Sequence, residues 1–226
     1  MPVNKEAYQL LKKELDEKQV TLVAVSKTKP VEDILELYQL GHRDFGENYV
    51  QELVEKASKL PHDIRWHYIG HLQTNKVKLI AHFVQLIHGV DSLKLLEEIN
   101  KQAEKQGRIQ DCLLQVHIAE EETKFGMDEN EINDLLSRYG NKQMNNVRIV
   151  GLMGMASFTD DMNKVRQEFQ KLKSIFDRLT TNDPIAIGLR LTTLSMGMSS
   201  DYKIAIKEGS NMVRIGSLLF GERSSP

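Results

Sequence analysis

Short apolar runs alternate with amphipathic stretches along this chain of 226 residues. The first run, residues 20–25, is rich in β-branched residues and too short for a helix, so it predicts a buried strand. Before it, Tyr8, Leu11 and Leu15 recur at steps of three and four among charged residues, which predicts an amphipathic helix. The pattern predicts strands over residues 20–27, 44–48, 66–70, 83–90, 112–118, 147–155, 191–195 and 213–216. It predicts helices over 5–18, 31–40, 50–60, 74–81, 93–106, 129–140, 162–179 and 200–208.

Repeated strand–helix units demand a parallel sheet with right-handed crossovers. Eight such units in a chain of this length favour closure into a TIM (β/α)8 barrel, preceded here by one extra helix. An open, doubly wound sheet is the alternative. The first predicted strand is not followed by a Gly-x-Gly-x-x-Gly loop, which disfavours a dinucleotide-binding fold of that kind. We therefore expect one α/β barrel domain over residues 1–226.

Charge and cysteine content narrow the functional classes. The 30 Lys and Arg residues against 32 Asp and Glu residues give a net charge of -2, and without a concentrated basic face we expect no nucleic-acid partner. The single cysteine, Cys112, lies in an apolar run and reads as a core residue of a protein from a reducing compartment. The charged N-terminus does not resemble a signal peptide, and no apolar segment is long enough to span a membrane. These features predict a soluble, cytoplasmic protein.

The first strand leads directly into a lysine, Lys27, and Pro30 then suits the start of a helix. A lysine held at the mouth of a buried strand would be desolvated, which lowers its pKa and favours the neutral amine that attacks carbonyl groups. The alternative is a lysine whose methylenes line the core edge while its charge stays in water. Lys29 lies beyond the strand, and we expect it to be a solvated neighbour.

Two later loops offer ligands for an anion on the same rim of the barrel. Ser195 begins one loop after the seventh strand, and Gly216 and Ser217 follow the eighth. In TIM barrels, loops at these positions commonly hold a phosphate, with help from the free N–H groups of a helical turn. Each loop alone could equally be an ordinary turn. Together with Lys27 they predict binding of a phosphorylated carbonyl compound.

Six motifs in order carry a resemblance that covers almost the whole chain. They are residues 24–30 (AVSKTKP), 45–52 (FGENYVQE), 66–76 (WHYIGHLQTNK), 151–155 (GLMGM), 194–201 (LSMGMSSD) and 212–221 (MVRIGSLLFG). On these motifs the chain resembles the YggS/PROSC family of pyridoxal 5'-phosphate (PLP) homeostasis proteins. That family resembles the barrel of alanine racemase, which implies a barrel of the alanine-racemase N-terminal-domain type.

The resemblance also implies roles for individual residues. Lys27 would carry PLP as an internal aldimine, with Asn48 beside the cofactor. Arg214 would face the pyridine nitrogen, where a permanent positive charge disfavours protonation of the ring and weakens it as an electron sink. The phosphate would be held by Ser195, Gly216 and Ser217.

Three further residues match regions near the cofactor, each with an ordinary alternative. Met153 and Met155 lie on the inward register of the sixth predicted strand and could touch the ring or simply fill the core. Lys124 matches the region where racemases place a basic group, and could equally be an exposed loop residue. His67 and His71 have the spacing of a helical metal pair, but their predicted strand context disfavours zinc.

The resemblance implies a PLP carrier and homeostasis protein, affecting amino-acid and keto-acid pools, without an established reaction. The chain stops before the domain that gives racemases their second catalytic base, which disfavours two-base racemisation and leads us to expect a monomer. PLP-dependent apo-enzymes are possible partners. The alternatives are a weak racemase-like enzyme or a lysine Schiff-base aldolase, for which Glu47 is the candidate carboxylate inside the rim.

Overall fold

A computed structural model describes residues 3–121, 125–141, 144–181, 186 and 188–221. Its strands are β1 Thr21–Val25, β2 Asp44–Glu47, β3 Arg65–Tyr68, β4 Leu86–Val90, β5 Gln110–Val116, β6 Val147–Gly154, β7 Thr193–Ser195 and β8 Met212–Ile215. Its α-helices are α1 Lys5–Glu17, α2 Val31–Gln39, α3 Val50–Lys59, α4 Val77–Ile80, α5 Leu93–Lys105, α6 Glu129–Asn141, α7 Met162–Thr180, α8 Tyr202–Lys207 and α9 Ser217–Phe220. A 3₁₀ turn, η1 Thr74–Lys76, precedes α4.

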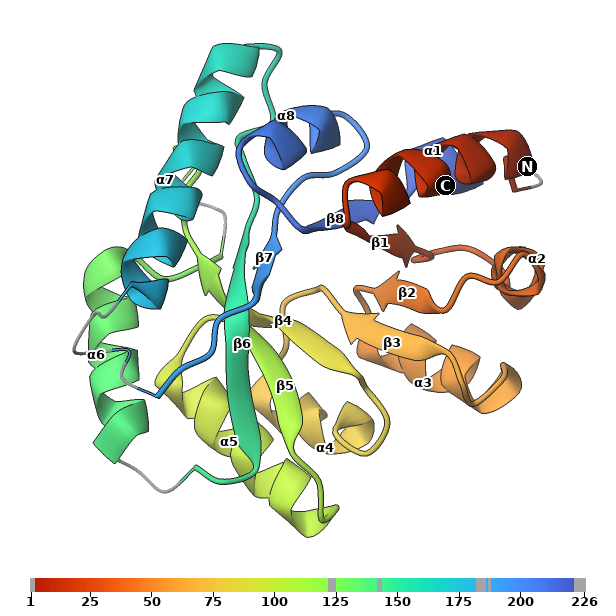
Figure 1. Cartoon of the computed structure of the whole chain (residues 1–226). Coiled ribbons are helices and arrows are strands. Elements are labelled where there is room, and N and C mark those ends of the chain that lie inside the picture. The colour runs from red at the N-terminus through yellow and green to blue at the C-terminus, as the bar shows by residue number, and fades with distance from the viewer. Residues whose placement is uncertain (1–2, 122–124, 142–143, 182–185, 187, 222–226) are drawn as a thin grey trace.

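Within the described residues, eight parallel strands close into a barrel in sequence order. The closure is made by β1, which pairs with β2 on one side and with β8 on the other, where Val23 lies opposite Arg214. Figure 1 shows the connecting helices outside the sheet, and α1 contacts α9. The predicted TIM barrel with an extra N-terminal helix is confirmed. Because all strands run in the same direction, the loops after them meet at one rim.

Alternating side chains divide the core into two layers. Outward-facing apolar residues, such as Phe45 and Leu114, pack against the helices in one large cluster. The inward-facing Val23, Leu113 and Met153 belong to a smaller cluster inside the barrel. Cys112 is fully buried, as expected of a core residue. The barrel interior is therefore filled with side chains rather than open, and a ligand has room only at its ends.

Most predicted elements occur, and the differences lie at their ends. Strand β1 stops at Val25, so Lys27 lies in a turn two residues beyond it. Strand β4 begins at Leu86 instead of residue 83, because the preceding residues form the turn that ends α4. The helix predicted over 74–81 divides into η1 and the single turn α4. Among the described residues, no helix is long and apolar enough to cross a membrane.

Candidate functional site

A pocket of about 520 Å³ lies at the rim where the carboxyl ends of the strands meet. It brings together five of the predicted site residues, namely Lys27, Asn48, Arg214, Gly216 and Ser217. The remaining walls include Lys29, Ile69, Met155, Phe158, Met198, Ser199, Ser200 and Leu218. The site thus combines amines, a guanidinium, an amide and hydroxyl groups within a largely apolar wall.

The turn that carries Lys27 is fixed by contacts from α3. Thr28 adopts a left-handed conformation (φ 62°), which is unfavourable for a β-branched residue, and its N–H donates to Glu52 Oε1 at 2.6 Å. Lys56 donates to the carbonyl oxygen of Ser26 at 2.7 Å and to Glu52 at 2.7 Å. The residues on both sides of Lys27 are therefore held, and Lys27 itself is half-buried against the pocket.

Glu47 does not face this pocket, so the carboxylate expected for an aldolase is not where that hypothesis needs it. As the last residue of β2, Glu47 points toward α3, where it accepts hydrogen bonds from Ser26 at 2.6 Å and Lys56 at 2.7 Å. Burial raises the pKa of Glu47, although Lys56 and Ser26 oppose the shift. The pleat explains the error, because neighbouring residues of a strand face opposite sides of the sheet.

Asn48 is placed by a close approach of two chain segments. A Cβ atom at Gly70 would lie 2.2 Å from the carbonyl oxygen of Asn48, so only glycine fits there. The same carbonyl accepts a hydrogen bond from the Tyr68 hydroxyl at 3.0 Å. The side-chain oxygen of Asn48 is buried and has no hydrogen-bond partner among the described residues. A buried acceptor without a partner at a pocket wall is suited to a ligand donor.

Arg214 reaches the pocket floor from β8 and is held from two sides. Its Nη1 donates to Ser195 Oγ at 2.6 Å, and its Nη2 donates to the carbonyl oxygen of Gly154 at 3.0 Å. Burial lowers the pKa of Arg214 to about 10, with Asp201 acting in the opposite direction. The guanidinium therefore stays charged at neutral pH and is oriented by fixed acceptors.

Ser195 does not reach the pocket, unlike the other predicted phosphate ligands. It ends β7 with its side chain inside the barrel, fully buried, where it contacts Arg214 and His88. Ser199 and Ser200, four and five residues later, line the pocket instead. Ser199 Oγ accepts a hydrogen bond from the Gly216 N–H at 3.3 Å, which joins the two loops. The motif at residues 194–201 contains these serines, but the sequence does not show which of them turns outward.

Gly216 and Ser217 form the opposite wall, at the start of α9. The first N–H groups of a helix have no acceptor within the helix, and the first residues of α9 line the pocket. Lys29 is half-buried rather than solvated as expected, since its Nζ donates to the carbonyl oxygen of Phe220 at 2.7 Å. Lys29 therefore attaches the end of α9 to the β1–α2 loop.

The further residues considered in the sequence analysis lie in different places. Met155 lines the pocket, whereas Met153 packs inside the barrel. Lys124 lies outside the described residues. His67 is buried beside Asp44 and His88, whereas His71 lies beside Asp91, so the two do not form a pair. No cluster of metal-ligating side chains occurs among the residues that the structure describes.

Comparisons with known proteins place this geometry in a family. The family described as "Alanine racemase, N-terminal domain" matches residues 5–224. The pyridoxal phosphate homeostasis protein of Aquifex aeolicus is 42% identical over 203 residues, which is 89% of this chain and 86% of that protein. The human protein of the same name is 40% identical over 216 residues, covering 91% of this chain and 77% of the relative. The chain belongs to the family of pyridoxal phosphate homeostasis proteins.

Solved structures agree with this assignment. PipY of Synechococcus elongatus, determined with PLP bound, is 36% identical and superposes with a TM-score of 0.86, covering 96% of this chain and 99% of PipY. Alanine racemase of Clostridium difficile superposes with a TM-score of 0.75 at 16% identity, over 60% of the racemase chain, and so shows a shared fold. The resemblance inferred from the six sequence motifs is confirmed.

Proposed function

We propose that this protein binds PLP in the pocket at the carboxyl ends of its strands and serves in PLP homeostasis as a carrier. The observation that carries the proposal is the meeting, in one pocket, of the Lys27 amine, the charged Arg214 and the N-terminal turn of α9. These groups match the aldehyde, the pyridine nitrogen and the phosphate of PLP. The relatives named for PLP homeostasis, and PipY with its bound PLP, support the same assignment.

Each wall then has a separate task. Lys27 would hold the cofactor through its amine, the group that can form a Schiff base with an aldehyde. Asn48 offers its unpartnered side-chain oxygen to the ring hydroxyl. Arg214 would present its guanidinium to the pyridine nitrogen, where a positive charge disfavours protonation of the ring and so limits carbanion chemistry. Gly216, with the hydroxyl of Ser217, receives the phosphate.

The kinds of titratable side chain that line the pocket favour a carrier over an enzyme. Among the described residues that line the pocket, the side chains able to titrate are Lys27, Lys29 and Arg214, and none of them is a carboxylate, imidazole or phenol. Two-base racemisation needs a general base on each face of the reacting carbon. We infer that PLP is delivered to apo-enzymes by a monomer in the cytoplasm.

Mapping the attachment site tests the proposal directly. Protein mixed with PLP is reduced with borohydride and analysed by peptide mass spectrometry, and we expect the adduct on Lys27. The variant Lys27→Ala should lose the yellow colour and the adduct. The matched variant Lys29→Met should keep both at saturating PLP, because Lys29 contacts α9. An adduct on Lys29, or one that survives in Lys27→Ala, contradicts the assignment.

A second measurement separates the carrier from a racemase. Exchange of the α-proton of alanine is followed by NMR in deuterated buffer with PLP-loaded protein, and free PLP at the same concentration is the control. We expect exchange no faster than with free PLP. Turnover clearly above that rate would identify an enzyme.

A further inference from the structure

A chain of buried polar side chains runs through the barrel from the pocket toward its other end. Arg214 Nη1 lies 2.6 Å from Ser195 Oγ, which lies 3.2 Å from His88 Nδ1. His88 Nε2 lies 3.0 Å from His67 Nδ1, and His67 Nε2 lies 3.1 Å from Asp44 Oδ1. Ser195 and His88 are fully buried, and His67 and Arg214 are exposed by only 3% and 4%. Polar groups buried this deeply must satisfy one another.

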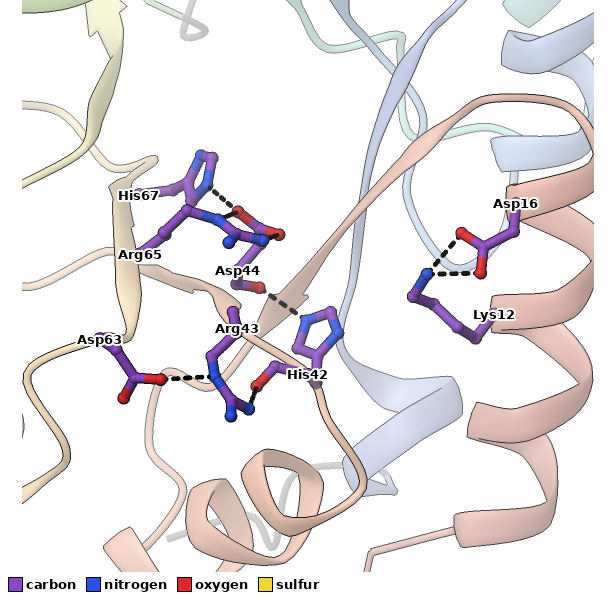
Figure 2. A network of polar contacts seen from close by, with 8 residues as sticks. All are labelled: Lys12, Asp16, His42, Arg43, Asp44, Asp63, Arg65 and His67. Atoms are coloured by element: carbon purple, nitrogen blue, oxygen red, sulfur yellow. Dashed lines mark hydrogen bonds and ion pairs between the residues drawn. The ribbon is translucent and has the colours of Figure 1, made fainter.

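At the Asp44 end of this series of hydrogen-bonded side chains, charged groups hold the contacts in place. Figure 2 shows the Asp44 carboxylate between His67 and Arg65, both of which donate to it. Burial raises the pKa of Asp44, but the hydrogen bonds from Arg65 and His67 prevail and hold it well below its usual range. These three residues line a second pocket at the amino ends of the strands. The chain therefore connects the two ends of the barrel.

The groups that can donate or accept on each side chain determine the direction of each hydrogen bond. Arg214 can only donate, so Ser195 Oγ accepts from it, and among the described residues His88 Nδ1 is the acceptor within reach of the Ser195 hydroxyl hydrogen. His88 Nδ1 is then unprotonated, and a neutral His88 carries its hydrogen on Nε2 and donates to His67 Nδ1. His67 in turn carries its hydrogen on Nε2 and donates to the Asp44 carboxylate, which can only accept. All hydrogen bonds point from Arg214 to Asp44.

We propose that His88 is a positioning residue for the cofactor pocket: as a neutral imidazole it accepts from Ser195 and thereby holds Arg214 in place. This inference rests on the proposed function, because the pocket that Arg214 faces is the one assigned to PLP. A protonated His88 would instead donate to Ser195, whose hydroxyl hydrogen would lose its buried acceptor. Burial, reinforced by the charge of Arg214, lowers the pKa of His88 well below its ordinary value and keeps it neutral.

The first test is made on the ligand-free protein. Long-range ¹H–¹⁵N NMR distinguishes a protonated from an unprotonated imidazole nitrogen, and we expect both His88 and His67 to carry hydrogen on Nε2 at pH 7. A protonated Nδ1 on His88 would overturn the proposal. Because no cofactor is present, this result is independent of whether the protein binds PLP.

The second test uses paired variants of His88. His88→Leu removes the acceptor and should weaken PLP binding about tenfold, with a changed Arg214 side-chain NMR signal. His88→Asn places an amide oxygen near the position of Nδ1 and should restore binding to within about threefold of the wild-type Kd. The exposed His62→Leu is the matched control and should bind as the wild type does.

The outcomes are separable. Wild-type affinity and an unchanged Arg214 signal in His88→Leu would overturn the positioning role, and so would equal losses in His88→Leu and His88→Asn. If His88→Leu does not fold, His88→Asn and the NMR of the wild-type protein still decide. Failure of the wild-type protein itself to bind PLP would overturn the proposed function and leave the histidine tautomers as a separate result.

Discussion

Thr28 has a strained backbone conformation and lies next to Lys27, the proposed attachment point. Its left-handed backbone costs on the order of 1 kcal/mol or more, and the hydrogen bond from its N–H to Glu52 offsets that cost. The adjacent Lys27 is displaced if the turn relaxes. A residue in a sparsely populated conformation next to the proposed attachment point indicates a turn built to present that side chain.

Replacing Glu52 with alanine should loosen this turn. The Thr28 N–H and one Lys56 hydrogen bond lose their acceptor, so we expect a loss of about 1–2 kcal/mol in the free energy of unfolding and several-fold weaker PLP binding. Urea unfolding and PLP titration measure the two effects. Glu55→Ala is the matched control on the same helix, since Glu55 forms an exposed pair with Lys59 and should change stability by less than about 0.5 kcal/mol. Equal effects of the two variants would contradict this role of Glu52.

His42 makes stability depend on pH. Its ring donates to the carbonyl oxygen of Asp44 at 2.8 Å, a contact visible in Figure 2, and packs edge-on against Phe45. Burial lowers the pKa of His42 to about 4, from an ordinary value of 6.5. The unfolded chain therefore binds a proton between these values that the folded protein does not. Stability is complete above pH 6.5 and falls as the pH drops toward 4, by about 3 kcal/mol in all.

The variant His42→Phe should flatten this dependence. We expect the slope of unfolding free energy against pH to fall by up to about 1.4 kcal/mol per pH unit between pH 4.5 and 6, whatever the absolute stability of the variant. Urea unfolding at several pH values measures the slope. The exposed His62→Phe serves as the control and should keep the wild-type slope. An unchanged slope in His42→Phe would show that His42 is not the group responsible.

At the scale of single residues, the sequence predicts chemistry better than direction. Lys27 could be placed at the pocket because it ends a predicted strand, and Asn48 and Arg214 because they lie in motifs shared with the family. Ser195 could not be placed, because a residue at the last position of a short strand turns inward or outward with a shift of one residue in register. Glu47 was misplaced for the same reason.

Helices and strands were predicted correctly where the hydrophobic periodicity extended over many residues. Their ends were predicted correctly where the sequence contains a recognisable helix-capping side chain. Ser92 accepts from the Leu95 N–H, and Asp128 exchanges hydrogen bonds with Glu131, so α5 and α6 begin where those side chains predict. Strand β7 has only three residues, and its predicted start at residue 191 was too early. Short strands in a barrel are defined by their neighbours more than by their own sequence.

Strand β7 depends on a glycine in its neighbour β6. A Cβ atom at Gly151 would lie 1.8 Å from the carbonyl oxygen of Thr193, its partner in the sheet. We expect Gly151→Ala to separate β6 from β7 and to lower the free energy of unfolding by about 3 kcal/mol or more, an overpacking effect. The loop that carries Ser199 should exchange its amide hydrogens faster in the same variant. Thermal unfolding and hydrogen exchange measure both effects.

Gly140 provides the control for this substitution. It lies near the end of α6 with open space around the position of a Cβ atom, so Gly140→Ala should be neutral or stabilising by up to about 1 kcal/mol. If Gly151→Ala were as stable as Gly140→Ala, the close approach of β6 and β7 would not constrain the barrel.

For the whole molecule, the closed barrel could be predicted because repeated strand–helix units leave few topologies. The buried chain from Arg214 to Asp44 could not. It crosses the barrel between residues of β2, β3, β4, β7 and β8. Its two halves meet at the contact between Ser195 and His88, which joins β7 and β4, two strands that are not neighbours in the barrel. The resulting molecule has a ligand pocket at one end and an ion-paired pocket at the other, joined by the buried polar chain in its interior.

Ligand binding to one end of such a barrel should stabilise all of it. A ligand that binds the folded state alone adds about 2.7 kcal/mol at a concentration 100 times its Kd, which corresponds to a rise of about 5–11 °C in Tm for a domain of this size. We expect PLP to produce this shift in the wild-type protein. Inorganic phosphate at the same concentration should produce a much smaller shift, because it engages only the wall formed by Gly216 and Ser217.

Lys27→Ala should show a smaller Tm shift with PLP than the wild-type protein, since the contacts of Arg214 and α9 remain while the covalent link is lost. A full Tm shift in that variant would mean that attachment through Lys27 adds nothing to the affinity. If PLP did not shift the Tm of the wild-type protein, the proposal that PLP binds in the pocket would be wrong.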